Sequence, residues 1–194
     1  MKIGINLLLW AGHVTQDHRP QLEAIAATGF DGAEIPMFDA SDVGHYRQLG
    51  ALLDDLGLQR TVCSAFTAPE HNPVSPDAAA RAGAFDQARR VVDCGQAMGA
   101  QLVVGPLFQP LGLFSGAPPS ETELEHCADF LRRLAPHMRD AGMVCAVEPL
   151  NRFEAHVLNT AEQGLAMMAR VADPAIGILY DTFHAHIEEK DPLA

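Results

Sequence analysis

Two segments of the chain each place a carboxylate directly after a short apolar run. In the first, Glu148 ends a run that begins at Val144, and Pro149 follows it. In the second, Asp181 follows a similar run, and the imidazole of His184 comes three residues later. A short apolar run is typical of a buried strand, and a proline just after it stops the hydrogen-bond ladder. We therefore expect both carboxylates at strand ends, where the backbone is rigid.

Carboxylates at the ends of neighbouring strands would repel each other unless a divalent cation or a shared proton lies between them. A metal ion is the simpler explanation for Glu148 and Asp181. Oxygen ligands with at most one imidazole favour Mn²⁺ or Mg²⁺ over Zn²⁺, which prefers histidine and thiolate ligands. We therefore expect a divalent-metal site and no organic cofactor.

Structural explanations exist for the same residues. Glu148 could cap a loop or pair with Arg152, and Asp181 could be a hydrogen-bonded buried residue. A carboxylate that directly follows a buried strand is more typical of a functional site, which favours function for Glu148. The structural explanation is favoured for three later residues, predicted to begin a solvated helix: His186, Glu188 and Glu189.

Apolar runs of strand length recur along the chain. The predicted strands cover residues 3–9, 32–37, 60–65, 101–105, 144–148 and 176–180. Between them lie longer segments in which apolar residues recur three or four positions apart, most clearly from Leu124 to Met138. Strands and helices are therefore predicted to alternate.

The expected helix boundaries carry capping residues. Capping-box pairs are formed by Ser120 with Glu123 and by Thr160 with Gln163. Ser75–Pro76 predicts a further helix start, since proline is favoured in a first turn. Glycines with positive φ are expected where helices end, at Gly29, Gly57, Gly99 and Gly142. The recurrence of this pattern indicates one repeated β/α unit.

The alternation of strands and helices predicts a parallel sheet covered by helices. A dinucleotide-binding sheet would carry G-x-G-x-x-G after its first strand, and residues 8–13 contain no such loop. Acidic residues collect instead at strand ends, at Glu34, Glu148 and Asp181, as in a (β/α)8 barrel. We therefore predict an α/β fold, a TIM barrel formed by residues 1–194 as a single domain. A closed barrel takes about 250 residues, so we expect truncation after about six β/α units, without strands 7 and 8.

Composition excludes several classes of protein. The 194 residues are 48% hydrophobic and 20% charged, which indicates a folded domain. Their net charge of −12 is the wrong sign for a nucleic-acid partner. No apolar run approaches the roughly 20 residues that span a membrane. The four cysteines form no CxxC pair, which disfavours a disulfide framework and favours a cytoplasmic location.

The two carboxylate segments together resemble the paired signature of the D-tagatose 3-epimerase (ketose 3-epimerase) family, in the xylose isomerase-like TIM-barrel superfamily. These segments are EPLNRFE at 148–154 and DTFHAHIEE at 181–189, and the turns at 29–31 and 55–58 are similar as well. The resemblance implies that Glu148 is a metal ligand and an acid/base group, and that Asp181 is a second ligand. It also implies that Glu154 and His184 bind the sugar. The family's remaining ligands, a histidine on the seventh strand and a glutamate on the eighth, have no counterpart here.

The resemblance implies an isomerase that epimerises a ketose at C3 through an enediolate, with a divalent metal. Such an enzyme removes a proton α to a carbonyl and returns one to the opposite face, so two carboxylates exchange roles as base and acid. Glu148 would be one of them, and the second is the family's glutamate on strand 8. We therefore do not expect these 194 residues alone to be a competent epimerase. We expect a ketose substrate and a homo-oligomer formed through the open sheet edges.

Other functions stay open from the sequence. A hydroxypyruvate isomerase or an aldose–ketose isomerase of the same superfamily would use related chemistry, although NRFE at 151–154 favours the epimerases by family likeness. An apurinic endonuclease would need more histidine ligands and a basic face, which the net charge of −12 opposes. The alternative outside enzymes is a catalytically silent fragment that lacks the C-terminal ligands.

Overall fold

The protein is described by a computed structural model over residues 1–191. Within these residues, six parallel strands form one sheet in the order β1-β2-β3-β4-β5-β6. The strands are β1 Gly4–Asn6, β2 Gly32–Pro36, β3 Gln59–Cys63, β4 Leu102–Gly105, β5 Val144–Val147 and β6 Ile176–Ile178. Each strand therefore lies beside its neighbour in sequence, with no reversal of order.

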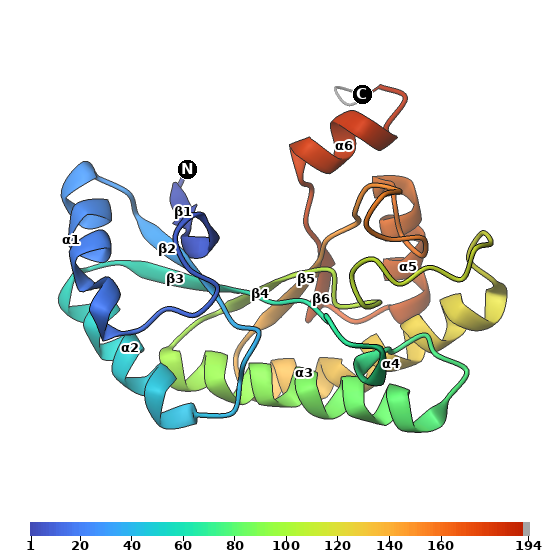
Figure 1. The fold of residues 1–194 in the computed structure, drawn as a ribbon, viewed down its shortest axis with the longest axis horizontal. Helices are drawn as coiled ribbons and strands as arrows, with labels where there is room; N and C mark the ends of the chain where they lie inside the picture. The colour runs from blue at the N-terminus through green and yellow to red at the C-terminus, as the bar shows by residue number, and fades with distance from the viewer. Residues whose placement is uncertain (192–194) are drawn as a thin grey trace.

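Every connection between successive strands contains a helix. The helices are α1 Arg19–Thr28, α2 Val43–Asp55, α3 Ala78–Met98, α4 Glu121–Asp140, α5 Ala161–Val171 and α6 Thr182–Glu188, the last of which follows β6. Short 3₁₀ turns cover Leu7–Leu9, Gln16–His18 and Pro69–His71. Figure 1 shows α1 to α5 around the outer side of a strongly curved sheet, with α6 beyond the end of β6. This arrangement confirms the predicted α/β fold and is the topology of a barrel, since a doubly wound sheet would reverse its strand order.

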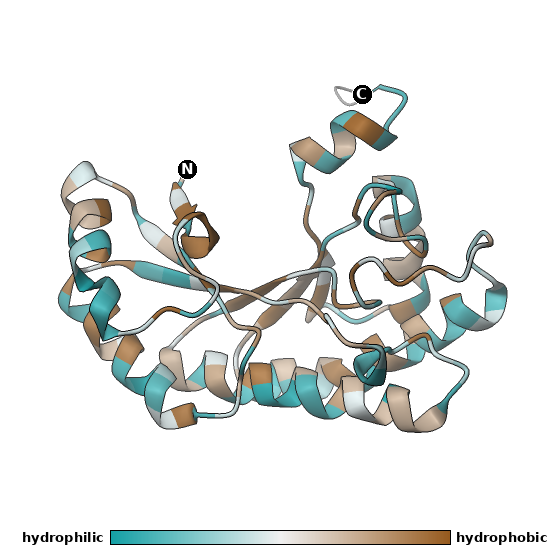
Figure 2. Cartoon of the chain, viewed as in Figure 1, coloured by the Kyte–Doolittle hydropathy of each residue, from teal (hydrophilic) through white to brown (hydrophobic). Residues whose placement is uncertain are grey.

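The hydrophobic core lies between the sheet and the helices. Val62, Val103 and Cys145 stand in register on three neighbouring strands, and each is at most 1% exposed. The predicted apolar stripe of α4 is confirmed, because its central members are buried: Cys127, Ala128, Leu131, Leu134 and Met138. Figure 2 accordingly shows hydrophobic residues along the strands and many hydrophilic residues on the helices. No helix within residues 1–191 is long and apolar enough to cross a membrane.

The capping predictions are confirmed with one exception. Ser120 and Thr160 begin α4 and α5 with complete capping boxes. The four predicted glycines have φ between +67° and +94°: Gly29, Gly57, Gly99 and Gly142. The predicted helix start at Ser75–Pro76 is wrong. Asp77 is the cap of α3 instead, since its side chain accepts the N–H of Ala79 at 2.9 Å.

The predicted first strand, residues 3–9, is too long. It ends at Asn6, because the Asn6 side-chain oxygen accepts the N–H of Leu8 at 2.8 Å and turns Leu7–Leu9 into a 3₁₀ helix. The last predicted strand, 176–180, likewise ends early, at Ile178. A short polar side chain that captures a backbone N–H competes with the sheet ladder. Within the described residues, β1 and β6 each pair with one strand and form the two edges of the sheet.

Helix α2 packs against α3 so closely that Gly50 has no room for a side chain. A Cβ there would lie 2.5 Å from the carbonyl oxygen of Met98, which is backbone and cannot move aside. We expect Gly50→Ala to lower the free energy of unfolding by about 2 kcal/mol, although alanine is normally the better helix former. Urea unfolding measures this change.

Gly44→Ala, in the first turn of the same helix, is the matched control. A Cβ there would meet only an Asp42 side-chain oxygen at 3.1 Å, so this variant should be as stable as the parent chain or more stable. Equal stability of the two variants would contradict close packing of α2 on α3.

Candidate active site at the carboxyl ends of the strands

The structure brings the two predicted carboxylates together. Glu148 directly follows β5, and Asp181 follows β6 and caps α6 by accepting the N–H of Phe183 at 2.7 Å. The two strands are parallel neighbours, with Val147 in register with Ile178. Because parallel strands end at the same edge of a sheet, this pairing delivers both side chains to one place.

His184 completes a cluster with these carboxylates. Its Nε2 atom lies 3.8 Å from Glu148 Oε1 and 4.0 Å from Asp181 Oδ2. One side-chain nitrogen or oxygen from each of the three residues lies within 4.8 Å of the others. Among the described residues this cluster has the donor types and the compactness that a divalent cation requires.

The electrostatics of the cluster favour a cation between its carboxylates. The pKa of Glu148 is raised to about 8, first because burial penalises its charged form and then because of the hydrogen bond to, and the charge of, Asp181. The charges of Glu34 and Glu154 raise it further. A cation bound between Glu148 and Asp181 would reverse the repulsion between them. The donor set therefore fits a hard divalent ion.

Glu154 is held beside this cluster by Asn151. The Asn151 side-chain amide donates to Glu154 Oε1 at 2.8 Å, and its nitrogen lies 2.9 Å from Nδ1 of His184. The two residues implied to bind sugar, Glu154 and His184, are thus joined through one buried amide. Asn151 is not among the site residues predicted from the sequence, because its partner His184 is 33 positions away. The signal available in the sequence was a polar residue between Glu148 and Glu154, the two glutamates predicted to act in the site.

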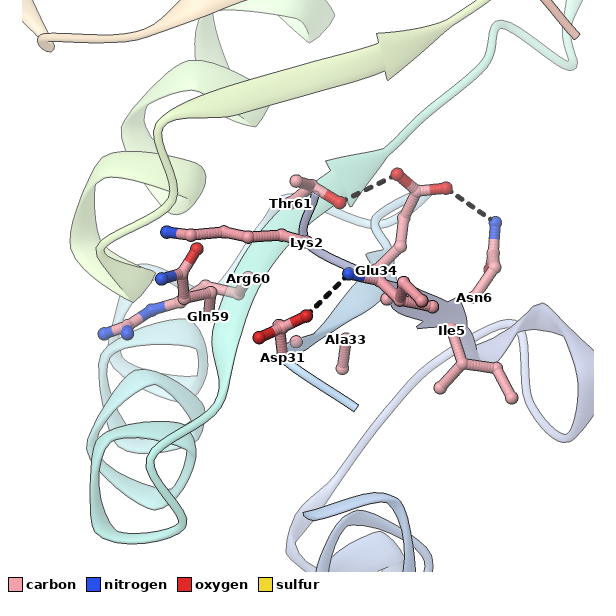
Figure 3. A pocket seen from close by; sticks show the side chains of 12 residues that line it. Lys2, Ile5, Asn6, Asp31, Ala33, Glu34, Gln59, Arg60 and Thr61 are labelled. Atoms are coloured by element: carbon pink, nitrogen blue, oxygen red, sulfur yellow. Dashed lines mark hydrogen bonds between the residues drawn. The ribbon is translucent and has the colours of Figure 1, made fainter. Parts of the chain in front are cut away.

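Glu34 does not lie at a strand end, which corrects the prediction made for it. It is the third residue of β2, and its carboxylate accepts from Asn6 Nδ2 at 2.9 Å and from Thr61 Oγ1 at 2.7 Å. These three residues are register partners on β1, β2 and β3, and Figure 3 shows the two hydrogen bonds that join them. They border a cavity of about 370 Å³ on the inner face of these strands. The charge of Glu34 nevertheless reaches the cluster, since it raises the pKa of Glu148.

The structural explanations for the neighbouring residues are also decided. Arg152 pairs with Glu188, at 2.9 Å between Nη2 and Oε2, and not with Glu148. The prediction that Glu188 is solvated is wrong, since its side chain is only 6% exposed. Glu189 has a protein partner as well, because its carboxylate accepts the N–H of Ala161 at 2.7 Å. His186 is exposed, as predicted.

The chain is similar in sequence and in fold to known proteins. The model of a family described as xylose isomerase-like TIM barrel matches residues 22–194. A probable ketose 3-epimerase from Synechocystis is 30% identical over 195 residues, a match that covers 100% of this chain and 67% of that protein. A ketose 3-epimerase from Arthrobacter globiformis is 29% identical, with 98% and 65% covered.

Solved structures give the same picture. An L-ribulose 3-epimerase superimposes with a TM-score of 0.90 at 30% identity, over 98% of this chain and 64% of its own. A D-allulose 3-epimerase from Methylomonas in complex with D-allulose has a TM-score of 0.89 at 27% identity, with 98% and 65% covered. The chain therefore spans about two thirds of the length of these relatives.

The raised pKa of Glu148 makes stability depend on pH. The pKa is about 8 in the folded chain against an ordinary 4.5, so the folded state binds more protons between these values, and stability falls as the pH rises through that window. We expect Glu148→Gln to be more stable than the parent by about 1–2 kcal/mol near pH 8 without added metal, because solvent access reduces the full effect of the shift. Urea unfolding at a series of pH values tests this.

Near pH 4 both states of the parent bind the proton, so the two proteins should have similar stability. Glu70→Gln, at an exposed glutamate, is the control and should leave the pH dependence of stability unchanged. A parent chain whose stability is constant between pH 5 and pH 8 would contradict the environment described for Glu148.

Proposed function

This chain belongs to the xylose isomerase-like TIM-barrel family and groups with its ketose 3-epimerases, and we propose on this basis that it acts in the metal-dependent epimerisation of a ketose at C3. The observation that carries the proposal is the cluster of Glu148, Asp181 and His184 at the ends of two neighbouring parallel strands. An enzyme that abstracts a proton next to a carbonyl needs both a base and a group that holds negative charge.

We assign the metal to Glu148 and Asp181, with Mn²⁺ or Mg²⁺ favoured over Zn²⁺ because both ligands offer oxygen. When bound, a divalent ion supplies Lewis-acid stabilisation for the negative charge that develops on the sugar oxygens during an enediolate mechanism. Asp181 is also the cap of α6, which fixes its backbone while one oxygen accepts from Phe183. Its orientation is therefore set before any ion binds.

Glu148 is proposed as the acid/base group at C3. Burial and neighbouring carboxylates raise the pKa of its metal-free side chain to about 8, and a bound cation would lower that pKa again. A group that both gives and takes a proton near neutral pH suits general acid–base catalysis. Its place directly after β5, before Pro149, keeps the carboxylate on a rigid backbone.

Glu154 and His184 are proposed as the sugar-binding residues. Glu154 lies in the segment after β5, and the amide of Asn151 links it to His184, which lies in the segment after β6 and belongs to the cluster. The carboxylate of Glu154, close to those of Glu148 and Asp181, would repel a phosphate group, which favours a sugar without phosphate. We propose a ketose as the substrate class.

We further propose that residues 1–194 form a single barrel domain that lacks its last two β/α units, because the chain spans only about two thirds of the length of the matched relatives. Epimerisation needs a second acid/base group on the opposite face of C3. The unpaired edges of β1 and β6 support association of the chain with itself, since free strand edges pair readily. The free state of all four cysteines supports a cytoplasmic location.

Metal binding should depend on the two proposed ligands. We expect Glu148→Gln and Asp181→Asn each to weaken Mn²⁺ binding at least about tenfold, since each removes one charged ligand. Asparagine is as good a helix cap as aspartate, so the second variant keeps α6 intact. Electron paramagnetic resonance of free Mn²⁺ measures the affinity.

Glu154→Gln is the matched control and should change Mn²⁺ affinity far less, because Glu154 is assigned to the sugar. Equal loss of metal affinity in all three variants would contradict these roles.

Catalysis should require more than these 194 residues. In D₂O with Mn²⁺ and D-allulose, we expect the chain ending at Ala194 to exchange no C3 hydrogen with solvent. A version extended by the last two β/α units of a relative should exchange it, and Glu148→Gln in that version should lower the rate at least about 100-fold. Proton NMR follows the exchange and identifies the product.

Metal-dependent C3 exchange by a chain shown by mass spectrometry to end at Ala194 would show that the two further β/α units are not required. An extended version that shows exchange at C1 only, with an aldose as product, would identify an aldose–ketose isomerase instead.

A further inference from the structure

The amide of Asn151 has a fixed orientation. This residue is 2% exposed, in the loop after β5. Its Oδ1 accepts the N–H of Phe153 at 2.9 Å, and its Nδ2 donates to Glu154 Oε1 at 2.8 Å. A backbone N–H only donates and a carboxylate only accepts, so the oxygen and the nitrogen of this amide cannot exchange places.

The imidazole of His184 therefore faces two donors. Nδ1 lies 3.1 Å from the backbone nitrogen of Asn151 and 2.9 Å from its Nδ2, and both nitrogens carry hydrogen. Nδ1 must then offer its lone pair, which leaves the proton of the neutral ring on Nε2. The ring is 8% exposed, so water does not replace these partners easily.

This tautomer determines what His184 can do in the cluster. Nε2, the nitrogen that carries hydrogen, is the one turned toward Glu148 and Asp181, at 3.8 Å and 4.0 Å. A histidine that binds a metal has the opposite arrangement, because its other ring nitrogen donates hydrogen to an acceptor. His184 is thus a hydrogen-bond donor at the cluster, although its position alone would permit it to be a third ligand.

We propose that Asn151 is a positioning residue that sets the hydrogen-bonding polarity of the sugar site. It orients His184 so that Nε2–H can donate a hydrogen bond. It also orients Glu154 so that Oε2, the oxygen not bound by Asn151, can accept one. On adjacent carbons of a ketose, an oxygen can accept a hydrogen bond from His184 while a neighbouring hydroxyl donates one to Glu154. The inference that the ligand is a sugar rests on the proposed function, whereas the inference about the tautomer of His184 rests on the hydrogen-bond contacts alone.

Long-range ¹H–¹⁵N NMR of the histidine-labelled 194-residue chain tests the tautomer at neutral pH. In the parent chain we expect hydrogen on Nε2 of His184 and none on Nδ1, and we expect excess Mg²⁺ to leave Nε2–H in place. Asn151→Asp puts an acceptor beside Nδ1, so hydrogen should appear there. A parent ring protonated on Nδ1, loss of Nε2–H on Mg²⁺ addition, or an unchanged ring in Asn151→Asp would overturn the proposal.

Asn159→Ala is the matched control. Asn159 braces the same loop, because its Nδ2 donates to the carbonyls of Leu150 at 2.8 Å and Ala155 at 3.0 Å. It should lower stability and leave the tautomer unchanged. A tautomer that moves as far in Asn159→Ala as in Asn151→Asp would show that loop order alone sets it, and would overturn the proposal.

Asn151→Ala is a second variant for the same test and is used if Asn151→Asp does not fold. It keeps the backbone donor and loses the amide, so Nε2–H should remain while the ¹⁵N shift of Nδ1 moves. An unmoved Nδ1 shift would overturn the contact between the amide and the ring.

The sugar part is tested in a version extended by the last two β/α units. There Asn151→Ala should raise KM for D-allulose about tenfold with a smaller change in kcat, and Asn159→Ala should not. An unchanged KM with the expected tautomer would overturn the sugar site and leave the positioning of His184 by Asn151 established. That result differs from failure of the proposed function, in which the extended parent itself shows no C3 exchange.

Discussion

The parallel pairing of β5 with β6 is the constraint on which the site depends. It places two carboxylates at one edge of the sheet, partly removed from water, where their mutual repulsion must be relieved. Two surrounding contacts stabilise this arrangement. Asp181 is fixed as the cap of α6, and His184 turns Nε2–H toward the two carboxylates. The remaining strands serve mainly to hold this edge in a curved sheet with a continuous core.

Much of this arrangement could be predicted, because its causes are local. Strand-length apolar runs, capping boxes and glycines at helix ends act over a few residues, so their spacing predicted the α/β alternation. The meeting of Glu148 and Asp181 followed from geometry alone, since parallel strands share an edge. The roles of these residues in metal binding and catalysis stay predictions, as do those of Glu154 and His184.

The errors have physical causes that act through side chains. Asn6 ended the first strand early by capturing the N–H of Leu8, a contact that apolar periodicity does not report. Glu188 was expected in solvent, yet its side chain binds Arg152, which lies 36 residues earlier in the loop after β5. Asn151 was missed for the same reason, since its importance comes from partners brought close only by the folded β5–β6 pair. Contacts of this kind depend on the tertiary fold and have no short-range signature.

The contacts between the end of the described chain and the segment after β5 bear on how the site assembles as the chain folds. Arg152 binds Glu188, Ala161 donates to Glu189, and Asn151 binds His184, so each contact closes a loop of 28 to 36 residues. The entropy of closing such loops grows only slowly with their length, and the contacts reinforce one another. We therefore expect the segment from β5 to α6 to fold as one cooperative unit. The chemical groups of the site belong to that late-synthesised unit, so the earlier strands can fold as a scaffold before any of them is in place.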